Sequence, residues 1–437
     1  MKNEEKTIWI DMTDLSGWQG HFTGIQRVVY NIASRFADTN KNVKYFIFDD
    51  RSKMFKIFDF QNFKINLETR LTNDDIELSN RQVVKLKIKQ AYLKSPNFVK
   101  RAIQVPRIKS SIKKSLQYRH KIKIQYSKNN KVLNKNSIKA VFGTGDTILI
   151  LGNSWDRPDL VPSLGDLRDE KALKVYQVIY DLIPVYQPQA FNAELFKIYS
   201  NNMFEVVTNS DGLLAISESS KRDVLRFCED LDLTCPLTSV IRLGDDIPQS
   251  KKPIKPKDLT ISASFVLCVG TIEVRKNHAI LYYAWKEGLR KGIKMPQLVI
   301  VGRQGWYTGD IIHTIKTDPD TRDKFHLLDN VNDDGLVWLY QNSLFTVYPS
   351  YYEGWGLPVA ESAAMGKLCI SSDKSSMPEI AGSLMEYFSP YNSDELARKI
   401  GKYLDVAQRV KKEKEIKSKY NTKSWDDCYQ QVRKLTN

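Results

Sequence analysis

Short apolar runs bounded by turn-forming residues recur along this chain, and such runs predict β-strands that are buried in a parallel sheet. In the first half of the chain they occupy residues 8–11, 43–48, 147–151, 175–180 and 212–216. A helix is expected at residues 24–36, directly after the first strand. Residues 49–140 show no such pattern, so we expect irregular, basic sequence there.

Strands and helices alternate again from residue 265 onward, which predicts a second doubly wound parallel domain. Residues 247–256 contain three prolines and are expected to form a linker. We therefore predict one domain at residues 1–246 and a second at residues 247–417. Residues 418–437 are expected to contain a closing helix.

The composition agrees with two domains, because 437 residues with 42% hydrophobic content can bury two sizeable cores. The five cysteines are odd in number and lack close metal-ligand spacing, which is typical of reduced thiols in a cytosolic protein. The first residues lack an apolar signal region, and no apolar run approaches the ~20 residues that span a bilayer. We expect a cytoplasmic protein that is soluble or peripheral on a membrane.

The net charge of +15 is concentrated in one segment. Residues 81–140 hold 18 of the 66 Lys and Arg and none of the 51 Asp and Glu, so the rest of the chain is slightly acidic. This basic insert fits an anionic membrane surface that carries lipid-linked acceptors, and it also fits a solvated or disordered loop. Nucleic acid is a third interpretation, but no RNA-binding or zinc-finger signature supports it, so no specific nucleic-acid partner is expected.

The candidate chemistry follows the apolar run at residues 344–348. Glu353 lies in a loop with Gly354 and Gly356, and Glu361 lies eight positions later, inside the helix that this loop opens. Open α/β sheets bind ligands at the carboxyl ends of their strands. The positive end of the helix favours a diphosphate, and a carboxylate can bind sugar hydroxyls. From the spacing alone, a simple loop with a capping glutamate fits equally well.

The segment from Pro349 to Glu361 resembles the EX7E motif of retaining glycosyltransferases of family 4, which have the GT-B fold. Residues 265–277 resemble the same family's strand, glycine turn and Arg-Lys pair. The likeness runs from about residue 8 to about residue 382. It implies an α/β fold with two Rossmann-like doubly wound domains that face each other across a cleft, with the basic insert in the first domain. The closing helix at residues 418–437 would cross back onto that domain.

The resemblance also implies roles in donor binding. Arg275 and Lys276 would hold the donor diphosphate, since two cations offset the charge that builds on a departing nucleotide. Glu353 would hold and orient the donor sugar, and Glu361 would accept hydrogen bonds from the ribose hydroxyls. Further donor contacts are implied for the motif residues Gly24, Asn332, Gly354, Trp355, Gly356 and Leu357.

The first domain should hold the acceptor. Many family members have His-Asp where this chain has Tyr180 and Asp181, so no imidazole is available at that point. Asp181 is a candidate for accepting or orienting the acceptor proton, and capping a loop is its alternative role. His21, in the glycine turn, is a candidate acceptor-side residue or a structural histidine. Ser217 is expected to be a helix N-cap.

The resemblance implies retaining transfer of a hexose from a nucleotide diphosphate sugar to a lipid-linked or glycan acceptor in bacterial O-antigen or capsule synthesis. Residues 21–29 and 302–306 look most like enzymes that use GDP-mannose or deoxyhexose donors. No cofactor and no metal ion are expected, and residues 81–140 would bind the inner face of the cell membrane. The alternatives are a glucosyltransferase with a soluble acceptor and a non-catalytic GT-B scaffold in an assembly complex.

Overall fold

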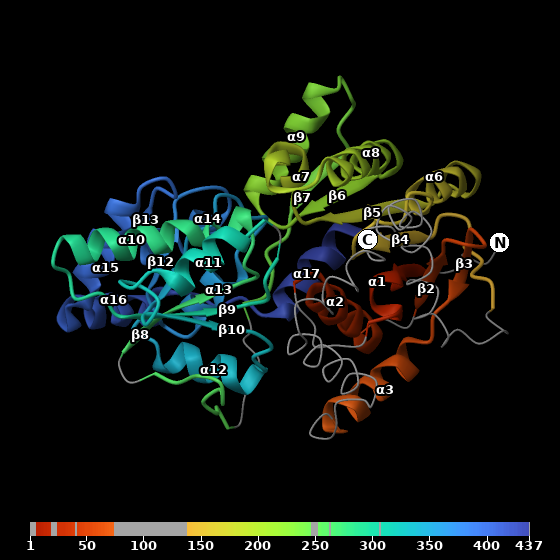
Figure 1. The fold of residues 1–437 in the computed structure, drawn as a ribbon. Helices are drawn as coiled ribbons and strands as arrows, with labels where there is room; N and C mark the ends of the chain where they lie inside the picture. Colours follow the sequence, from red (N-terminus) through yellow and green to blue (C-terminus); the bar gives the residue numbers. More distant parts are fainter. Residues whose placement is uncertain are drawn as a thin grey trace, which may run out of the picture. The chain divides into compact units, whose positions relative to one another are not determined.

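The computed structural model describes residues 6–18, 24–39, 42–73, 138–245, 252–261, 264–305 and 307–436. The chain forms two compact units, and each is described by itself. Figure 1 labels their helices and strands. The larger unit consists of Met1–Asp11, His21–Val43 and Phe142–Asn437. The smaller unit consists of Met12–Gly20 and Lys44–Val141.

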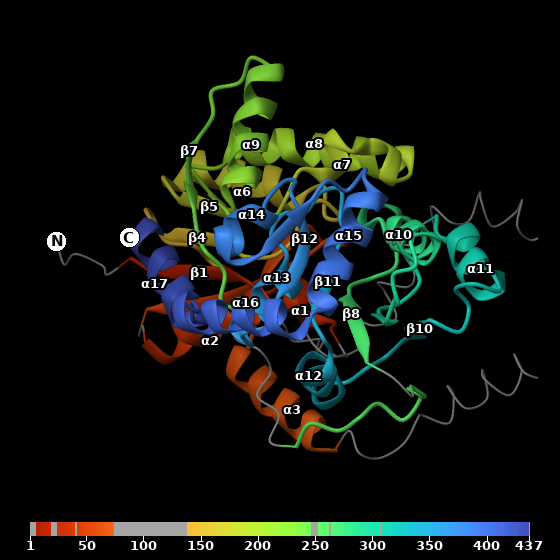
Figure 2. The same cartoon turned by 90° about the vertical axis from the view of Figure 1, so that its left-hand side faces the viewer.

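The larger unit contains two parallel sheets. In the first sheet the strands lie in the order β1 (Ile8–Asp11), β4 (Thr147–Ile150), β5 (Lys174–Ile179), β6 (Gly212–Ala215) and β7 (Leu237–Val240). One face is covered by α6 (Leu160–Lys171), α8 (Ala193–Asn209) and α9 (Glu218–Asp230), and the other by α2 (Ile25–Thr39) (Figures 1 and 2). Because helices cover both faces, β1, β4 and β6 are buried at every position.

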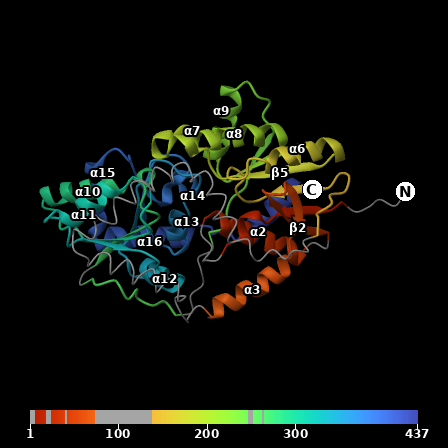
Figure 3. The ribbon, with the colours of Figure 1, turned by 45° about the vertical axis from the view of Figure 1, so that its right-hand side comes forward.

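The second sheet has the strand order β10 (Phe325–Leu328), β9 (Gln297–Val301), β8 (Phe265–Val269), β11 (Thr346–Tyr348), β12 (Cys369–Ser372) and β13 (Glu386–Phe388), all parallel. One face carries α10 (His278–Arg290), α11 (Gly309–Thr317) and α15 (Ser393–Leu404) (Figure 3). The other carries α12 (Asp333–Asn342), α13 (Leu357–Ala364) and α16 (Val406–Lys419). The second half of the chain is thus doubly wound, as predicted.

Short helical turns complete several connections, namely α7 (Ile183–Tyr186), η2 (Pro188–Ala190), η3 (Val274–Lys276), α14 (Met377–Ala381) and η4 (Gly382–Leu384). The closing helix α17 (Trp425–Thr436) packs beside α2 (Figure 2). The Phe36 and Tyr429 rings meet edge to face with their centroids 4.8 Å apart, and Arg35 Nε lies 2.6 Å from Asp426 Oδ1. The C-terminal helix therefore joins the first sheet's α2 layer.

The smaller unit contains α1 (Thr13–Ser16), the antiparallel strands β2 (Val43–Asp49) and β3 (Met54–Ile57), and α3 (Phe60–Asn73). The expectation of irregular sequence from residue 49 is therefore wrong for β3 and α3. Phe55 packs against Phe46 and Phe48, at centroid distances of 5.7 and 5.1 Å, which stabilises the hairpin. Asp59 Oδ1 accepts the Asn62 N–H at 2.9 Å at the start of α3.

The predicted strands of the first half are confirmed, with ends that differ from the expected ones by one residue or less. Residues 81–137 of the basic insert lie outside the described part of the chain. Among the described helices, none combines the length and apolar character needed to cross a membrane. All five cysteines are free thiols, and Cys235 is the one that is only partly buried.

Candidate functional site

The candidate donor residues meet where the second sheet reverses its strand order. The chain runs from β8 to β9 and β10 on one side and then returns to β11 on the other side of β8. Arg275 and Lys276, in η3, follow β8, and Glu353 follows β11. Such a switch point at the carboxyl ends of parallel strands is the usual ligand site of a doubly wound sheet.

Two cations and a tyrosine surround the Glu353 carboxylate. Arg275 Nη1 lies 2.7 Å from Glu353 Oε2, and Lys276 Nζ lies 2.6 Å from Oε1. Tyr348, the last residue of β11, donates to Oε1 at 3.0 Å. The second guanidinium nitrogen of Arg275, Nη2, lies 2.7 Å from Glu273 Oε1. The Arg275 guanidinium is therefore held between two carboxylates, in a fixed orientation.

The charges of this cluster determine its protonation. Burial by itself raises the pKa of Glu353, but Arg275 and Lys276 outweigh burial and lower that pKa to about 2. Burial lowers the pKa of Lys276, and the Glu353 carboxylate opposes that shift. Burial and the neighbouring Glu353 charge raise the pKa of Tyr348 well above its ordinary value. Glu353 is therefore an ionised acceptor, and Tyr348 is a neutral donor.

The loop between β11 and α13 is fixed by serines from the next connection. Ser376 Oγ donates to the Glu353 carbonyl at 3.0 Å, and the Ser375 hydroxyl binds the same carbonyl. Gly356 precedes α13 with a φ of 128°, a conformation that favours glycine. Leu357 begins the helix and Pro358 follows it, where a missing N–H costs little. The N-terminus of α13 thus begins four residues after Glu353.

Gly354 brings this loop against the loop that follows β5 in the first sheet. A Cβ at Gly354 would lie 2.1 Å from the Tyr180 carbonyl oxygen and 3.1 Å from Asp181 Cβ, so only glycine fits. Ser220 Oγ bridges the two loops, because it donates to the Tyr180 carbonyl at 2.9 Å and lies 3.4 Å from the Gly354 carbonyl. The two loops with candidate roles in donor and acceptor binding are therefore in direct contact.

Asp181 faces the cation cluster from the acceptor side. Its Oδ1 accepts the Ile183 N–H at 3.0 Å, which is the loop-capping role that the sequence offers as the alternative to proton acceptance. Burial and the Glu353 carboxylate raise the pKa of Asp181, and Arg275 opposes the rise. A carboxyl with a raised pKa that lies near the donor cations is suited to accept a proton. The Tyr180 hydroxyl donates to the carbonyl of Leu151, directly after β4, at 2.6 Å.

Glu361, on α13, is buried and engaged at both carboxylate oxygens. Arg27 Nη1, from α2, lies 3.0 Å from Glu361 Oε1. Tyr340 Oη, from α12, donates to Oε2 at 2.7 Å. Burial raises the pKa of Glu361, and the Arg27 cation opposes that rise most strongly. The predicted ribose acceptor is therefore held by two residues that the sequence analysis did not assign.

The remaining predicted donor residues have local structural partners. Asn332 is the N-cap of α12, accepting the Gly335 N–H at 2.9 Å. Trp355 is buried beneath the Arg242 guanidinium, which lies 5.0 Å from the ring centroid. Gly24 has a φ of 51° immediately before α2. His21 lies outside the described residues.

Several partners in the site were missed from the sequence, namely Arg27, Glu273, Tyr340 and Tyr348. Arg27 and Glu273 lie within segments that carry the family resemblance, but nothing in the pattern identifies their partners. Tyr348 ends an apolar strand, and a polar hydroxyl at that position is a signal by which the sequence alone could identify it as a site residue. Ser217 is the predicted N-cap, and its Oγ accepts the Ser220 N–H at 2.9 Å.

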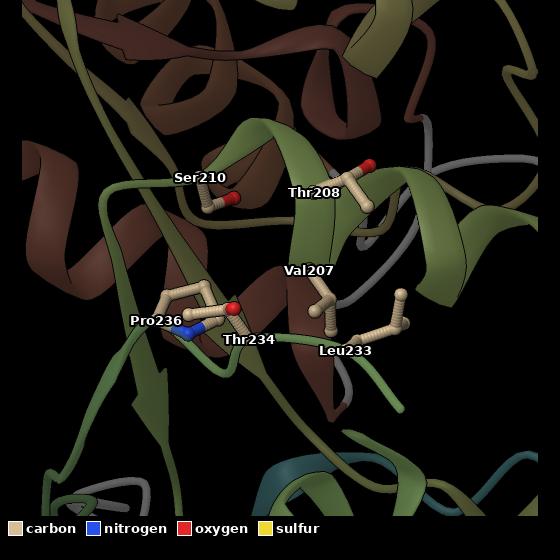
Figure 4. Close-up of a pocket in the computed structure, with 6 residues that line it drawn as sticks. All are labelled: Val207, Thr208, Ser210, Leu233, Thr234 and Pro236. Carbon is tan, nitrogen blue, oxygen red and sulfur yellow. The ribbon is translucent and has the colours of Figure 1, made fainter. Parts of the chain in front are cut away.

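A separate cavity of about 350 Å³ lies in the first sheet's layer and is lined by Val207, Thr208, Ser210, Leu233, Thr234 and Pro236 (Figure 4). These residues precede β6 and β7, so the cavity lies at the amino ends of the strands, at the edge opposite Asp181. It has no charged lining residue.

Within the described ranges, no group of three His, Cys, Asp or Glu side chains could hold a metal ion.

Comparison with known proteins agrees with the geometry of the second sheet. Residues 251–423, which contain the cation cluster and Glu361, match the family model "Glycosyl transferases group 1". Residues 251–423 therefore form a domain of the glycosyl transferases of group 1. The group 1 match thus contains every residue of the candidate donor site except those contributed by the first sheet's layer.

Curated relatives of this chain include two mannosyltransferases of Escherichia coli. The serotype-specific mannosyltransferase WbdA is 28% identical over 265 residues, which cover 58% of this chain and 32% of that protein. The O-antigen chain mannosyltransferase B is 25% identical over 221 residues, which cover 50% of this chain and 56% of that protein. The chain therefore matches about a third to a half of the length of these relatives.

Solved structures agree on the fold of this chain. HepE of Anabaena, in complex with UDP and glucose, has a TM-score of 0.58 at 16% identity and covers 99% of both chains. Sucrose-phosphate synthase of Thermosynechococcus elongatus has a TM-score of 0.59 at 15% identity, covering 99% of this chain and 98% of that one. The predicted fold class is confirmed at the level of a GT-B fold with two Rossmann-like parallel sheets.

Proposed function

We propose that this chain is a retaining hexosyltransferase that moves a hexose, with mannose or a deoxyhexose favoured, from a nucleotide diphosphate sugar to a lipid-linked or glycan acceptor in bacterial surface-polysaccharide synthesis. The observation that supports this most directly is the clamp of Arg275 and Lys276 on Glu353 at the switch point of the second sheet. The names of the curated relatives favour mannose.

The cation clamp is suited to a leaving diphosphate. Arg275 uses Nη1 and Nη2 for Glu353 and Glu273, and a guanidinium carries five N–H donors, so it can bind a phosphate oxygen without releasing both carboxylates. The α13 N-terminus, which begins four residues after Glu353, would add backbone N–H donors for the diphosphate. Donors that are fixed before the reaction stabilise developing charge without reorganisation.

Glu353 would accept hydrogen bonds from the donor sugar, because its low pKa keeps it ionised and Tyr348 fixes its orientation. Glu361 would accept hydrogen bonds from the ribose hydroxyls. Asp181 would accept or orient the acceptor hydroxyl proton, for which its raised pKa is suitable. Retention of the anomeric configuration is carried over from the family resemblance.

Donor binding tests the proposal. We expect one class among GDP-, UDP- and dTDP-sugars to raise the melting temperature of the wild type and to lose this effect in Glu361→Ala. Incubation with a lipid-linked or oligosaccharide acceptor should then give a product with the donor's anomeric configuration. Stabilisation without turnover on any acceptor would favour a non-catalytic scaffold, and turnover on a soluble acceptor alone would favour the glucosyltransferase alternative.

The same proposal includes domain boundaries at residues 246 and 417, activity without a metal ion, and membrane binding by residues 81–140. Activity should survive thorough chelation, and its restoration by one divalent ion would contradict metal independence. The charge of the basic insert supports binding to anionic lipid. A folded variant without residues 81–140 should sediment less with anionic liposomes, and unchanged sedimentation would exclude this membrane role.

A further inference from the structure

The contact between Arg27 and Glu361 joins helices that belong to different sheets of the larger unit. Arg27 is the third residue of α2, and Glu361 lies on α13. Their side chains are 17% and 8% exposed, and their charged atoms are 3.0 Å apart. A pair this well shielded is worth more than a surface ion pair, and losing one partner leaves a buried charge uncompensated.

We propose that Arg27 is a positioning residue for donor recognition, which holds the Glu361 carboxylate in the charged and oriented form that accepts hydrogen bonds from ribose hydroxyls. This inference rests on the proposed function, in which Glu361 contacts the ribose. In this proposal Arg27 acts through Glu361 and does not contact the reacting atoms.

The geometry fixes both carboxylate oxygens. Arg27 occupies one acceptor position on Oε1, and Tyr340 occupies one on Oε2. Each carboxylate oxygen has two lone pairs, so each keeps one further acceptor position. A ribose presents two neighbouring hydroxyl donors, which matches two remaining acceptors on a carboxylate that cannot rotate.

The charge of Glu361 also depends on Arg27. Burial raises the pKa of this carboxyl, Arg27 on α2 and Tyr340 on α12 lower it, and Asp333 on α12 raises it further. Without the Arg27 cation, burial would favour the protonated carboxyl, which is a poorer acceptor for a hydroxyl. In Arg27→Gln, the affinity for the ribose hydroxyls should therefore increase as the pH rises.

The experiment compares a nucleoside diphosphate with its 2′,3′-dideoxy analogue by calorimetry from pH 6 to 8.5, using UDP and GDP. Both probes carry the same phosphates, so the ratio of their dissociation constants isolates the hydroxyl contacts. The wild type should prefer the ribonucleotide at least about tenfold, the value of a charged hydrogen bond. Arg27→Gln should lose about tenfold of this preference at pH 7 and regain it at higher pH. Arg27→Lys should retain most of the preference.

Arg35 provides a matched control, because it lies two turns later on α2 and pairs with Asp426, which is 72% exposed. Arg35→Gln should leave the ratio unchanged. The proposal is overturned if Arg27→Gln keeps the wild-type ratio at every pH, or if it weakens both probes equally, which would indicate a role in phosphate binding or folding. Absence of any preference in the wild type, with Glu361→Gln binding normally, would instead remove the ribose role of Glu361 and the proposal with it. Thermal unfolding of each variant identifies any that fail to fold.

Discussion

The contact between Gly354 and Tyr180 makes one position in the site unusually sensitive to a single methyl group. In Gly354→Ala the new Cβ would lie 2.1 Å from the Tyr180 carbonyl oxygen. Real Cβ atoms essentially never lie closer than 3.0 Å to another heavy atom, so the two loops must separate by about 1 Å. Gly354 does not have a positive φ, so alanine suits its backbone and the clash is the main cost.

The separation should affect catalysis more than stability. Glu353 is the neighbour of Gly354, so the displacement would move it relative to Asp181 on the opposing loop. A misplacement of about 1 Å costs on the order of 100-fold in rate when reacting groups must be aligned. Overpacking of this kind costs about 1–3 kcal/mol of stability. We therefore expect kcat to fall about 100-fold and the melting temperature by a few degrees.

The assay is steady-state sugar transfer at saturating donor, together with thermal unfolding of the same samples. Gly309→Ala is the matched control, because a Cβ at Gly309 would meet no atom within 4 Å, and it should behave as the wild type. A kcat for Gly354→Ala within about threefold of the wild type would refute the reasoning. Such a result would mean that the Gly354 and Tyr180 loops are not in contact in the reacting enzyme.

Three further predictions concern the charges and caps around the site. The pKa of Glu353 is about 2 in the folded protein, against an ordinary value of 4.5. The ionised carboxylate therefore stabilises the fold above pH 4.5, and this contribution is lost as the pH falls. Urea unfolding should show a loss of about 2 kcal/mol in the free energy of unfolding between pH 5 and pH 3, and this loss should be absent in Glu353→Gln. His278 is buried, and the Glu273 backbone is a hydrogen-bond partner that acts on its ring, so His278→Leu should cost about 1 kcal/mol of unfolding free energy at pH 7; an unchanged or higher melting temperature would contradict that contact. Ser217→Ala should cost about 1 kcal/mol in denaturant unfolding with an unchanged donor KM, and a changed KM would contradict a purely capping role.

The strands were predictable because their burial is continuous. β1 and β4, for example, are buried at all four positions, and each is a short apolar run between turn residues. The hairpin strand β3 was missed for the opposite reason. It has one buried side chain, Phe55, while Met54 and Ile57 are exposed, so its burial is neither alternating nor continuous. Its pairing with β2 depends on tertiary packing of aromatic rings rather than on local pattern.

The motif residues of the site could be located from the sequence, but their pairing could not. Glu361 is predicted from the sequence to bind the donor, yet its partners Arg27 and Tyr340 lie 334 and 21 positions away in the chain. Only the folded topology brings α2, α12 and α13 together at this carboxylate. Asp181 shows the converse case, because both of its proposed roles fit the structure. It accepts the Ile183 N–H as a loop cap and still faces Arg275 with a raised pKa.

The ion pairs that Arg275 and Lys276 form with Glu353 change the role expected for Glu353. From the sequence, Arg275 and Lys276 were assigned to the diphosphate, and Glu353 was assigned to the sugar as a separate group. In the structure Glu353 binds both cations, so it also fixes them before any donor arrives. A group that both orients the sugar and holds the cations contributes to donor binding and to transition-state stabilisation. Removal of its charge should therefore raise the donor KM and lower kcat together, whereas removal of a sugar contact alone would leave the diphosphate clamp, and most of the donor affinity, intact.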